Sequence, residues 1–418
     1  MPRTALRSGL MTSVFPQLRL RDPTPELLAL PWEIPLAGWS GDRLPFRELP
    51  VGPSRHLVRF LALERGLVAL KEEPAEIATR EYEVLRHLED EALPAVRPLG
   101  ISVAVSGESA ILLTRYLPHS LQYRRLLSRV QPGPGHLRDQ LLDAMAGLLV
   151  DLHRGGVYWG DCSLANTLFR RDGNKVQAYL VDAETGELHP SLSDGQRAYD
   201  LEVLVENVAF GLADLAAMQG REDLMDDALA AAESARERYR RLWDELHAEI
   251  EVGSGDRYAM AARVRRLNDL GFAIDEIRIE PGPGGRVRLR TAVANRRFHA
   301  REIERLAGLR ALEGQARLLL NDLREYGVWL EGAEHRSLDP DEMARRWLVE
   351  VYRPAIARLA LLMPPGGDSV QAYCDVLETK WLRSEKARLD IGLAAAIEAY
   401  LADGIGELEA GDTAGASG

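Results

Sequence analysis

The pattern of apolar and polar residues predicts a strand-rich region in the first third of the chain. "HLVRFLALE" (56–64) and "LVALKE" (67–72) flank a turn at Arg65–Gly66 and are typical of a β-hairpin. Between residues 76 and 91 the apolar positions follow a helical spacing, and residues 110–117 return to a strand pattern. We therefore expect a small antiparallel sheet that is interrupted by one helix.

Helical patterns dominate the rest of the chain. Residues 137–156 form an amphipathic pattern that ends at a pair of glycines, a frequent helix stop. Residues 167–182 predict a hairpin, and residues 195–218 predict a long helix. A second hairpin, which turns at residues 282–285, interrupts the helical patterns that follow.

The length of 418 residues is typical of two or three domains. The patterns divide the chain into an extended, Pro-rich arm (1–45), a strand-rich lobe (46–117), a helix-rich lobe (118–220), a mostly helical C-terminal domain with one hairpin (221–405) and a disordered, low-complexity tail (406–418). The predicted fold class is α+β. Nothing in the sequence indicates an oligomeric state.

The composition excludes several classes of function. A formal net charge of −12 argues against a general nucleic-acid binder. Cys162 and Cys374 have no metal-ligand spacing, so we expect neither a disulfide framework nor a zinc site. We find no signal peptide and no apolar run of the roughly 18 to 20 residues that span a bilayer. The cytoplasm is the expected location.

Lysine is rare in this chain, which makes Lys71 informative. Only four of the 52 basic residues are lysines, so arginine serves wherever a solvated cation suffices. Lys71 ends the apolar strand "LVAL", and we interpret it as a point charge for phosphate groups; the alternative is an edge-strand Lys that faces solvent. Glu81 on the next helix is placed to hold this ammonium, with Glu76 and Glu83 as rivals.

The stretch "GVYWGDCSLANTLF" carries an Asp and an Asn five residues apart, Asp161 and Asn166. This is the spacing of a phosphotransfer loop, in which the Asp accepts the proton of the attacking hydroxyl and the Asn binds Mg²⁺. Asp182 ends the strand one hairpin later, where a second metal ligand belongs. A polar turn is the alternative for the loop alone, but Lys71, Glu81 and these three residues occur in the required order.

With these residues in place, "LHRGGVYWGDCSLANTLF", "LVALKEE" and "YLVDAET" resemble the protein-kinase-like superfamily. The likeness is greatest to its bacterial lipopolysaccharide kinases, the Kdo and heptose kinases, and it covers about residues 46–217. It implies a bilobal fold, ATP and Mg²⁺ binding, and transfer of the γ-phosphoryl group to a hydroxyl. The whole chain also resembles bacterial proteins that fuse such a half to a C-terminal domain of unknown function.

Several positions depart from the pattern of the regulated protein kinases. Trp159 and Gly160 replace the His and Arg before the catalytic Asp, so control by loop phosphorylation is not expected. Asp182 is followed by Ala183 and Glu184, and Glu184 is either an additional metal ligand or a surface acid.

The segment beyond Asp182 is short. Asp200 lies 18 positions after Asp182 and is predicted to brace the catalytic loop from the long helix. So short a segment leaves no platform for a peptide, which favours a non-protein acceptor.

Two further basic stretches are candidate anion sites. The glycine-rich phosphate loop is reduced to "VGPSRH", in which Gly52, Ser54 and Arg55 are expected to contact phosphates unless the stretch is an ordinary turn. In the second hairpin, alternate residues share one strand face, and this face is either solvated or binds an anionic partner. Its arginines are Arg286, Arg288 and Arg290.

The leading hypothesis is an ATP- and Mg²⁺-dependent phosphotransferase with an alcohol acceptor. Its rivals are a nucleotide-binding pseudokinase that regulates a partner through the C-terminal domain, nucleotidyl transfer on the same fold, and an anion-binding module centred on the arginine hairpin. The acceptor itself cannot be named from the sequence.

Overall fold

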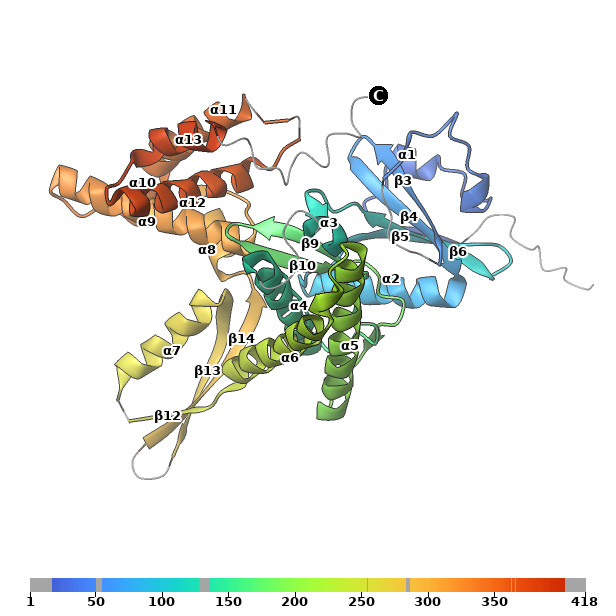
Figure 1. Cartoon of the computed structure of the whole chain (residues 1–418), viewed down its shortest axis with the longest axis horizontal. Coiled ribbons are helices and arrows are strands. Elements are labelled where there is room, and N and C mark those ends of the chain that lie inside the picture. The colour runs from blue at the N-terminus through green and yellow to red at the C-terminus, as the bar shows by residue number, and fades with distance from the viewer. Residues whose placement is uncertain are drawn as a thin grey trace, which may run out of the picture.

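The computed structural model describes residues 17–49, 55–127, 135–253, 255–282, 286–361, 363–364 and 366–402. A sheet of N-terminal strands, drawn in blue and cyan, lies beside a mainly helical region in green (Figure 1). The C-terminal residues form a projecting hairpin in yellow and a layer of helices in orange and red. No helix among the described residues is both long and apolar enough to cross a bilayer.

The N-terminal region is one antiparallel sheet with the strand order β1-β5-β6-β4-β3-β2. The strands are β1 (Gln17–Leu20), β2 (Phe46–Arg47), β3 (Leu57–Leu63), β4 (Gly66–Pro74), β5 (Pro98–Val103) and β6 (Ser109–Arg115). Helix α2 (Ala75–Asp90) packs across β5 and β6 through Val84, Leu85 and Leu88, whose helical spacing puts them on one buried face. Central strand β4 carries Lys71 between Val58 of β3 and Leu112 of β6.

Residues 17–45 do not form the extended arm that the sequence predicted. Besides β1, they contain α1 (Pro25–Leu28) and a 3₁₀ turn, η1 (Leu36–Gly38), which fold back onto the sheet. Trp32, Leu36 and Trp39 are buried there with sheet residues such as Leu70. The free energy gained by burying these large apolar groups offsets the conformational entropy that the segment loses when it folds onto the sheet. Residues 1–16, the rest of the predicted arm, lie outside the described residues.

The helical lobe is built around α4 (His136–Arg154), which is buried along most of its length. Helices α5 (Asp194–Met218) and α6 (Met225–His247) pack with α4 in one hydrophobic core that also includes the buried face of α2. The smaller elements are β7 (Ser120–Leu121), α3 (Tyr123–Leu127), β8 (Val157–Tyr158), β9 (Thr167–Asp172), β10 (Lys175–Leu180), β11 (Glu187–Leu188) and η2 (Glu222–Leu224).

The C-terminal region begins with a three-stranded sheet and continues with helices around a second core. Trp347 and Tyr373 are fully buried at the centre of this core. The elements are β12 (Ile250–Gly253), α7 (Arg257–Asp269), β13 (Phe272–Pro281), β14 (Arg286–Arg296), α8 (Phe298–Ala307), α9 (Glu313–Glu334), α10 (Pro340–Trp347), the π-helical turn η4 (Leu348–Tyr352), α11 (Arg353–Ala360), α12 (Ser369–Ala387) and α13 (Gly392–Ala402). The predicted tail, residues 406–418, lies outside the described residues.

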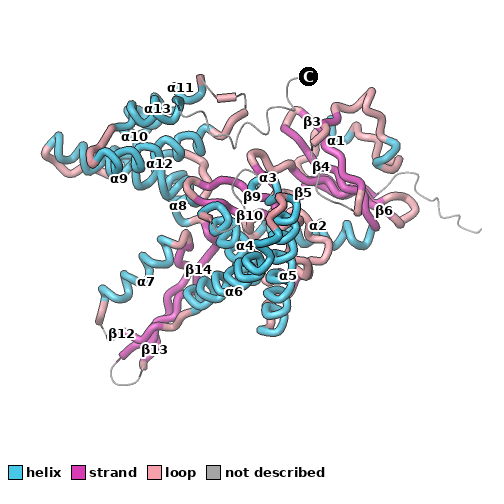
Figure 2. The backbone as a smooth tube through the Cα atoms, in the orientation of Figure 1, coloured by secondary structure: helices cyan, strands magenta, loops and turns pink. Residues whose placement is uncertain are grey.

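The tip of the β9–β10 hairpin meets the start of α9 (Figure 2). The buried carboxylate of Asp172 accepts hydrogen bonds from the backbone N–H groups of Gly314 and Gln315, both at 2.8 Å. These amides belong to the first turn of α9, whose own N-cap residue is Leu312. A carboxylate from the helical lobe therefore caps a helix of the C-terminal region.

Two ion pairs flank this contact. Arg170 reaches Asp368 at 2.7 Å, and Arg171 binds both carboxylate oxygens of Asp375, at 2.6 and 2.8 Å. The acid partners are largely buried, so these pairs are better shielded from water than surface pairs. The hairpin that separates Asn166 from Asp182 is thus held at its tip by the C-terminal region.

Candidate functional site

A cleft of about 390 Å³ lies between the sheet and the helical lobe. Its walls contain residues from β4, α2 and the segments on either side of the β9–β10 hairpin. Seven of them are charged or polar residues singled out by the sequence: Arg55, Lys71, Glu81, Asp161, Asn166, Asp182 and Glu184. Residues more than 100 positions apart therefore share one site.

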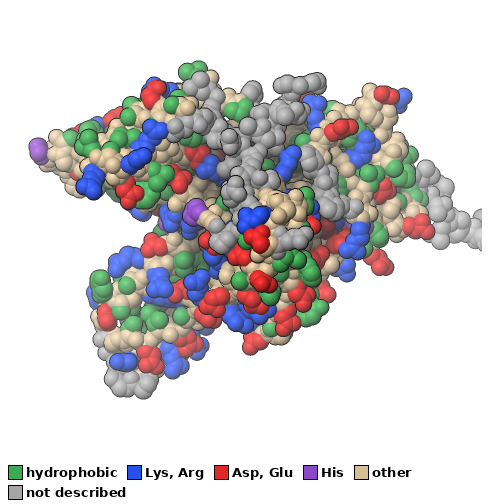
Figure 3. Space-filling view, viewed as in Figure 1, with side chains coloured by type: hydrophobic (Ala, Val, Ile, Leu, Met, Phe, Trp, Pro, Cys, Tyr) green, Lys and Arg blue, Asp and Glu red, His purple; other side chains and the backbone are tan. Residues whose placement is uncertain are grey.

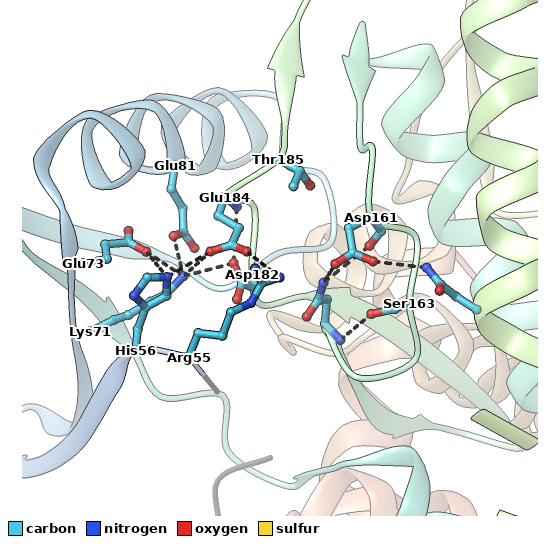
Figure 4. Close-up of polar contacts among 12 residues, drawn as sticks. Arg55, His56, Lys71, Glu73, Glu81, Asp161, Ser163, Asp182, Glu184 and Thr185 are labelled. Carbon is cyan, nitrogen blue, oxygen red and sulfur yellow. Dashed lines mark hydrogen bonds and ion pairs between the residues drawn. The ribbon is translucent and has the colours of Figure 1, made fainter. Parts of the chain in front are cut away.

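Lys71 lies at the centre of a group of carboxylates (Figure 4). Its Nζ is 2.9 Å from Oε2 of Glu81 and 3.0 Å from Oδ1 of Asp182. Burial alone lowers the pKa of Lys71, but the surrounding negative charges outweigh it, and the net pKa lies well above the usual value. The side chain is therefore a permanent cation inside the cleft.

Glu73 is a third close carboxylate in this group, and sequence reasoning missed it. It lies two residues from Lys71 on β4, so both side chains project from the same face of the strand. Its carboxylate is fully buried and contacts Nζ of Lys71 at 2.9 Å. The alternation of β4 was the available signal, because it places residue 73 on the face of residue 71.

Glu184 lies on the same side of the cleft as Lys71. Its carboxylate is 3.2 Å from Nε2 of His56 and 4.0 Å from Nζ of Lys71, with a long contact of 3.9 Å to Arg55. His56, Glu73 and Glu184 offer ligand atoms within 4.8 Å of one another. A cation, the Lys71 ammonium, is already within 4.0 Å of both glutamates. A role for Glu184 as an additional metal ligand stays a prediction.

Asp161 and Asn166 are held together at the opposite wall. Nδ2 of Asn166 donates to Oδ2 of Asp161 at 2.9 Å, and Nδ2 of Asn207 on α5 donates to Oδ1 at 3.1 Å. The Asp161 carboxylate is thereby fixed by two amides. Asn207 was not found from the sequence, because its distance of 46 positions from Asp161 is bridged only by the packing of α5.

The ends of the β9–β10 hairpin bring Asn166 and Asp182 close to each other. The backbone N–H of Val181 donates to the carbonyl oxygen of Asn166 at 3.1 Å. Among the described residues, neither Oδ1 of Asn166 nor Oδ2 of Asp182 accepts a hydrogen bond. A carboxylate and an amide oxygen form the hard donor set that Mg²⁺ prefers, so these residues fit the metal that a phosphotransferase needs.

Asp200 is fully buried beneath the loop. Its carboxylate accepts hydrogen bonds from the backbone N–H groups of Trp159, at 2.9 Å, and Gly160, at 2.8 Å, and it also contacts Nε2 of His153 at 3.0 Å. Burial lowers the pKa of His153, although the Asp200 charge opposes this. Asp200 thus anchors the backbone that leads into Asp161.

Gly160 has a left-handed backbone, with φ of 78°. A Cβ atom at this position would lie 3.2 Å from the carbonyl oxygen of Thr185. The Thr185 hydroxyl in turn donates to the carbonyl oxygen of Trp159 at 2.7 Å. The loop backbone and the segment after Asp182 are therefore packed directly on each other.

The predicted phosphate loop is only partly described. Gly52 and Ser54 lie outside the described residues, and the side chain of Arg55 is mostly exposed at the rim of the cleft.

On the second hairpin, each arginine faces an acid of the neighbouring segment: Arg290 is 2.7 Å and Arg288 3.6 Å from Glu249, and Arg286 is 4.0 Å from Glu251. Basic and acidic side chains are interspersed there (Figure 3). The hairpin is therefore a mixed charged face, and an anionic partner at this face stays a prediction.

A sheet lobe above a helical lobe, with a Lys–Glu pair and an Asp–Asn loop facing one cleft, defines a protein-kinase-like α+β fold. Residues 63–224 match the model of the lipopolysaccharide kinase (Kdo/WaaP) family. Residues 241–405 match a domain of unknown function, DUF4032. The chain joins a kinase-like fold to this C-terminal domain, which confirms the family resemblance predicted from the sequence.

Two solved structures that are similar to part of this chain share little sequence with it. A structure of WaaP in complex with acyl carrier protein is 17% identical, with a TM-score of 0.35, and the match covers 54% of this chain and 99% of that one. The BubR1 kinase domain is 15% identical, with a TM-score of 0.30, over 35% of this chain and 48% of that one. The search of curated proteins finds no match.

Proposed function

We propose that this protein transfers the γ-phosphoryl group of ATP, in the presence of Mg²⁺, to a hydroxyl group of a non-protein acceptor. The observation that supports this best is the pairing of Lys71 with Glu81 and Asp182 across the cleft from the Asp161–Asn166 pair. These are the parts that phosphoryl transfer requires, since its catalysis consists mostly of positioning and charge stabilisation.

In this proposal, Lys71 binds phosphate oxygens of ATP while Glu81 keeps the ammonium directed into the cleft. Oδ1 of Asn166 and the carboxylate of Asp182 hold Mg²⁺, which neutralises charge on the phosphates when it is bound. The apolar part of the cleft, which includes Ala69, Val96 and Leu168, accommodates the base.

Asp161 acts on the acceptor. The acceptor oxygen forms a bond to the γ-phosphorus as the bond between this phosphorus and the β,γ-bridging oxygen breaks, and ADP leaves. The hydroxyl proton passes to the Asp161 carboxylate, which Asn166 and Asn207 hold in orientation.

A non-protein acceptor is supported by the segment between Asp182 and α5. Only 11 residues separate Asp182 from Asp194, the first residue of α5, and β11 pairs this segment with β8. It is too short and too closely packed to provide a docking surface for an extended peptide. The family matched by residues 63–224 is named for lipopolysaccharide, which makes sugar hydroxyls the first acceptors to test.

The test is to incubate the full-length protein with ATP, MgCl₂ and candidate sugar acceptors and to measure ADP release. We expect acceptor-dependent ADP release, which Asp182→Ala abolishes and the exposed control Asp90→Ala retains. Release of pyrophosphate would instead identify nucleotidyl transfer. Thermal stabilisation by ATP with no turnover on any acceptor would identify a pseudokinase, and either result would replace the proposal.

A further inference from the structure

A second cavity, of about 630 Å³, lies between the helical lobe and the C-terminal region. Its walls come from α4, α6 and β10 on one side and from β14, α8 and α9 on the other. The ATP cleft described above is lined by a separate set of residues. The size is within the range of small-molecule sites.

Three cations line this cavity. Lys175 begins β10, Arg317 lies on α9 and Arg296 ends β14, so the three come from distant parts of the chain. Burial and the positive charges of Arg317 and Arg296 lower the pKa of Lys175, and the negative charges of Asp172 and Asp143 partly oppose this. Both guanidinium groups are thus within electrostatic range of Lys175, whose side chain is exposed at the start of β10. A bound anion would relieve the repulsion between these like charges.

These cations are poorly neutralised by the protein. Neither Lys175 nor Arg317 forms an ion pair with a described residue; Arg317 donates only to the neutral amide oxygen of Asn174, at 3.1 Å. Arg296 has a long contact of 3.6 Å to Asp151, and its buried Nε has no partner in the described part of the chain.

The carboxylates on the same wall are mostly committed elsewhere. Asp172 accepts from the first turn of α9, and Glu313 accepts from the ring and backbone of His299. Asp143 pairs with Arg238 at 2.6 Å. Exposed Asp269 is the one acid on this wall without a partner among the described residues, and exposed Arg241 is similarly unpaired.

We propose that this cavity binds a small phosphorylated molecule through Lys175, Arg296 and Arg317. A phosphate monoester carries nearly two negative charges at neutral pH and three acceptor oxygens, which matches a group of one ammonium and two guanidinium groups. A ligand there contacts both halves of the chain at once.

The binding test uses titration calorimetry on the full-length protein at low salt, with the ATP cleft saturated by Mg²⁺ and a non-hydrolysable ATP analogue. The probes are inorganic phosphate, pyrophosphate and ribose 5-phosphate. We expect at least one of these probes to bind with a Kd below about 1 mM. Lys175→Gln should weaken the binding of that probe at least about tenfold. Lys386→Gln, an exposed lysine on α12, is the matched control and should leave binding unchanged.

The proposal would be overturned by absence of binding for all three probes, or by equal binding to Lys175→Gln and the parent protein. Binding of a probe only while the ATP cleft is empty would also overturn it, because the probe would then occupy that cleft. Arg317→Gln provides a second variant on a different element, and a thermal melt of each variant establishes that it is folded.

Discussion

Lys71 and Glu73 lie two residues apart on β4 and form a 2.9 Å ion pair inside the cleft. Because Glu81 and Asp182 also contact the same ammonium, Lys71 is shared among three carboxylates before any nucleotide binds. Phosphate oxygens must therefore compete with Glu73 for Lys71. The affinity of Lys71 for phosphate therefore depends on the strength of its ion pair with Glu73.

Glu73→Gln should strengthen ATP binding. The substitution removes one negative charge next to the phosphates and frees Lys71, and an ion pair worth about 1 kcal/mol corresponds to a roughly fivefold lower KM for ATP. Steady-state kinetics with varied ATP measures this. Glu83→Gln, an exposed position on α2, is the control, and an unchanged or higher KM for Glu73→Gln would contradict the competition.

Asp161→Asn should lower kcat by about 100-fold or more while the KM for ATP stays near the parent value. The amide cannot accept the acceptor's proton, but it has nearly the same shape and leaves the Lys71 side of the cleft intact. Rapid measurement of ADP release gives kcat. A proportional loss of ATP binding, seen as lost thermal stabilisation, would show that Asp161 acts on the nucleotide rather than the acceptor.

Asp172→Asn should destabilise the protein by about 1 to 3 kcal/mol. An amide has one acceptor oxygen for the two N–H groups of α9 and directs its own N–H groups at the other amide. Urea unfolding measures the change, with Asp90→Asn as the surface control. If the two variants unfold at the same urea concentration, the cap contributes nothing to stability.

His153 should make stability fall in mildly acidic solution. Its folded-state pKa is below the usual 6.5 because of burial, so the unfolded chain binds the proton more readily. The penalty is absent above pH 6.5 and grows as pH falls from there towards the folded-state pKa. In urea unfolding at pH 8 and pH 5.5, His153→Gln should therefore lose less stability than the parent on acidification.

The exposed residue His335 provides the comparison for this pH effect. His335→Asn removes an exposed histidine and should show the same pH dependence as the parent. A parallel loss for the parent and His153→Gln would assign the acid sensitivity to other groups.

The parts of the site that lie on one local pattern could be predicted from the sequence. Lys71 ends an apolar strand, and Asp161 and Asn166 keep a fixed spacing within one loop. These residues can therefore be recognised from their neighbours in the sequence. The family resemblance and the α+β fold followed from the same short motifs. Glu81 was weighed against Glu76 and Glu83, and in the structure Glu81 contacts Lys71.

The contacts that depend on packing between distant elements could not be predicted. Asn207 reaches Asp161 only through the placement of α5, and Asp172 reaches α9 across 142 positions of chain. The burial of Trp32 and Trp39 was missed because their segment is too short and irregular for a periodic pattern. Each of these contacts is decided by tertiary structure rather than by propensity.

Gly160 limits which side chains this position of the loop can accept. The regulated protein kinases carry an Arg at this position, but here any side chain would meet the carbonyl of Thr185 and would also require a left-handed backbone that costs an L-residue roughly 1 to 2 kcal/mol. Gly160→Arg would thus strain the loop backbone at the position where it adds a phosphate-binding cation. Adding the Arg of the regulated kinases to this loop would therefore require accompanying shifts in the segment around Thr185.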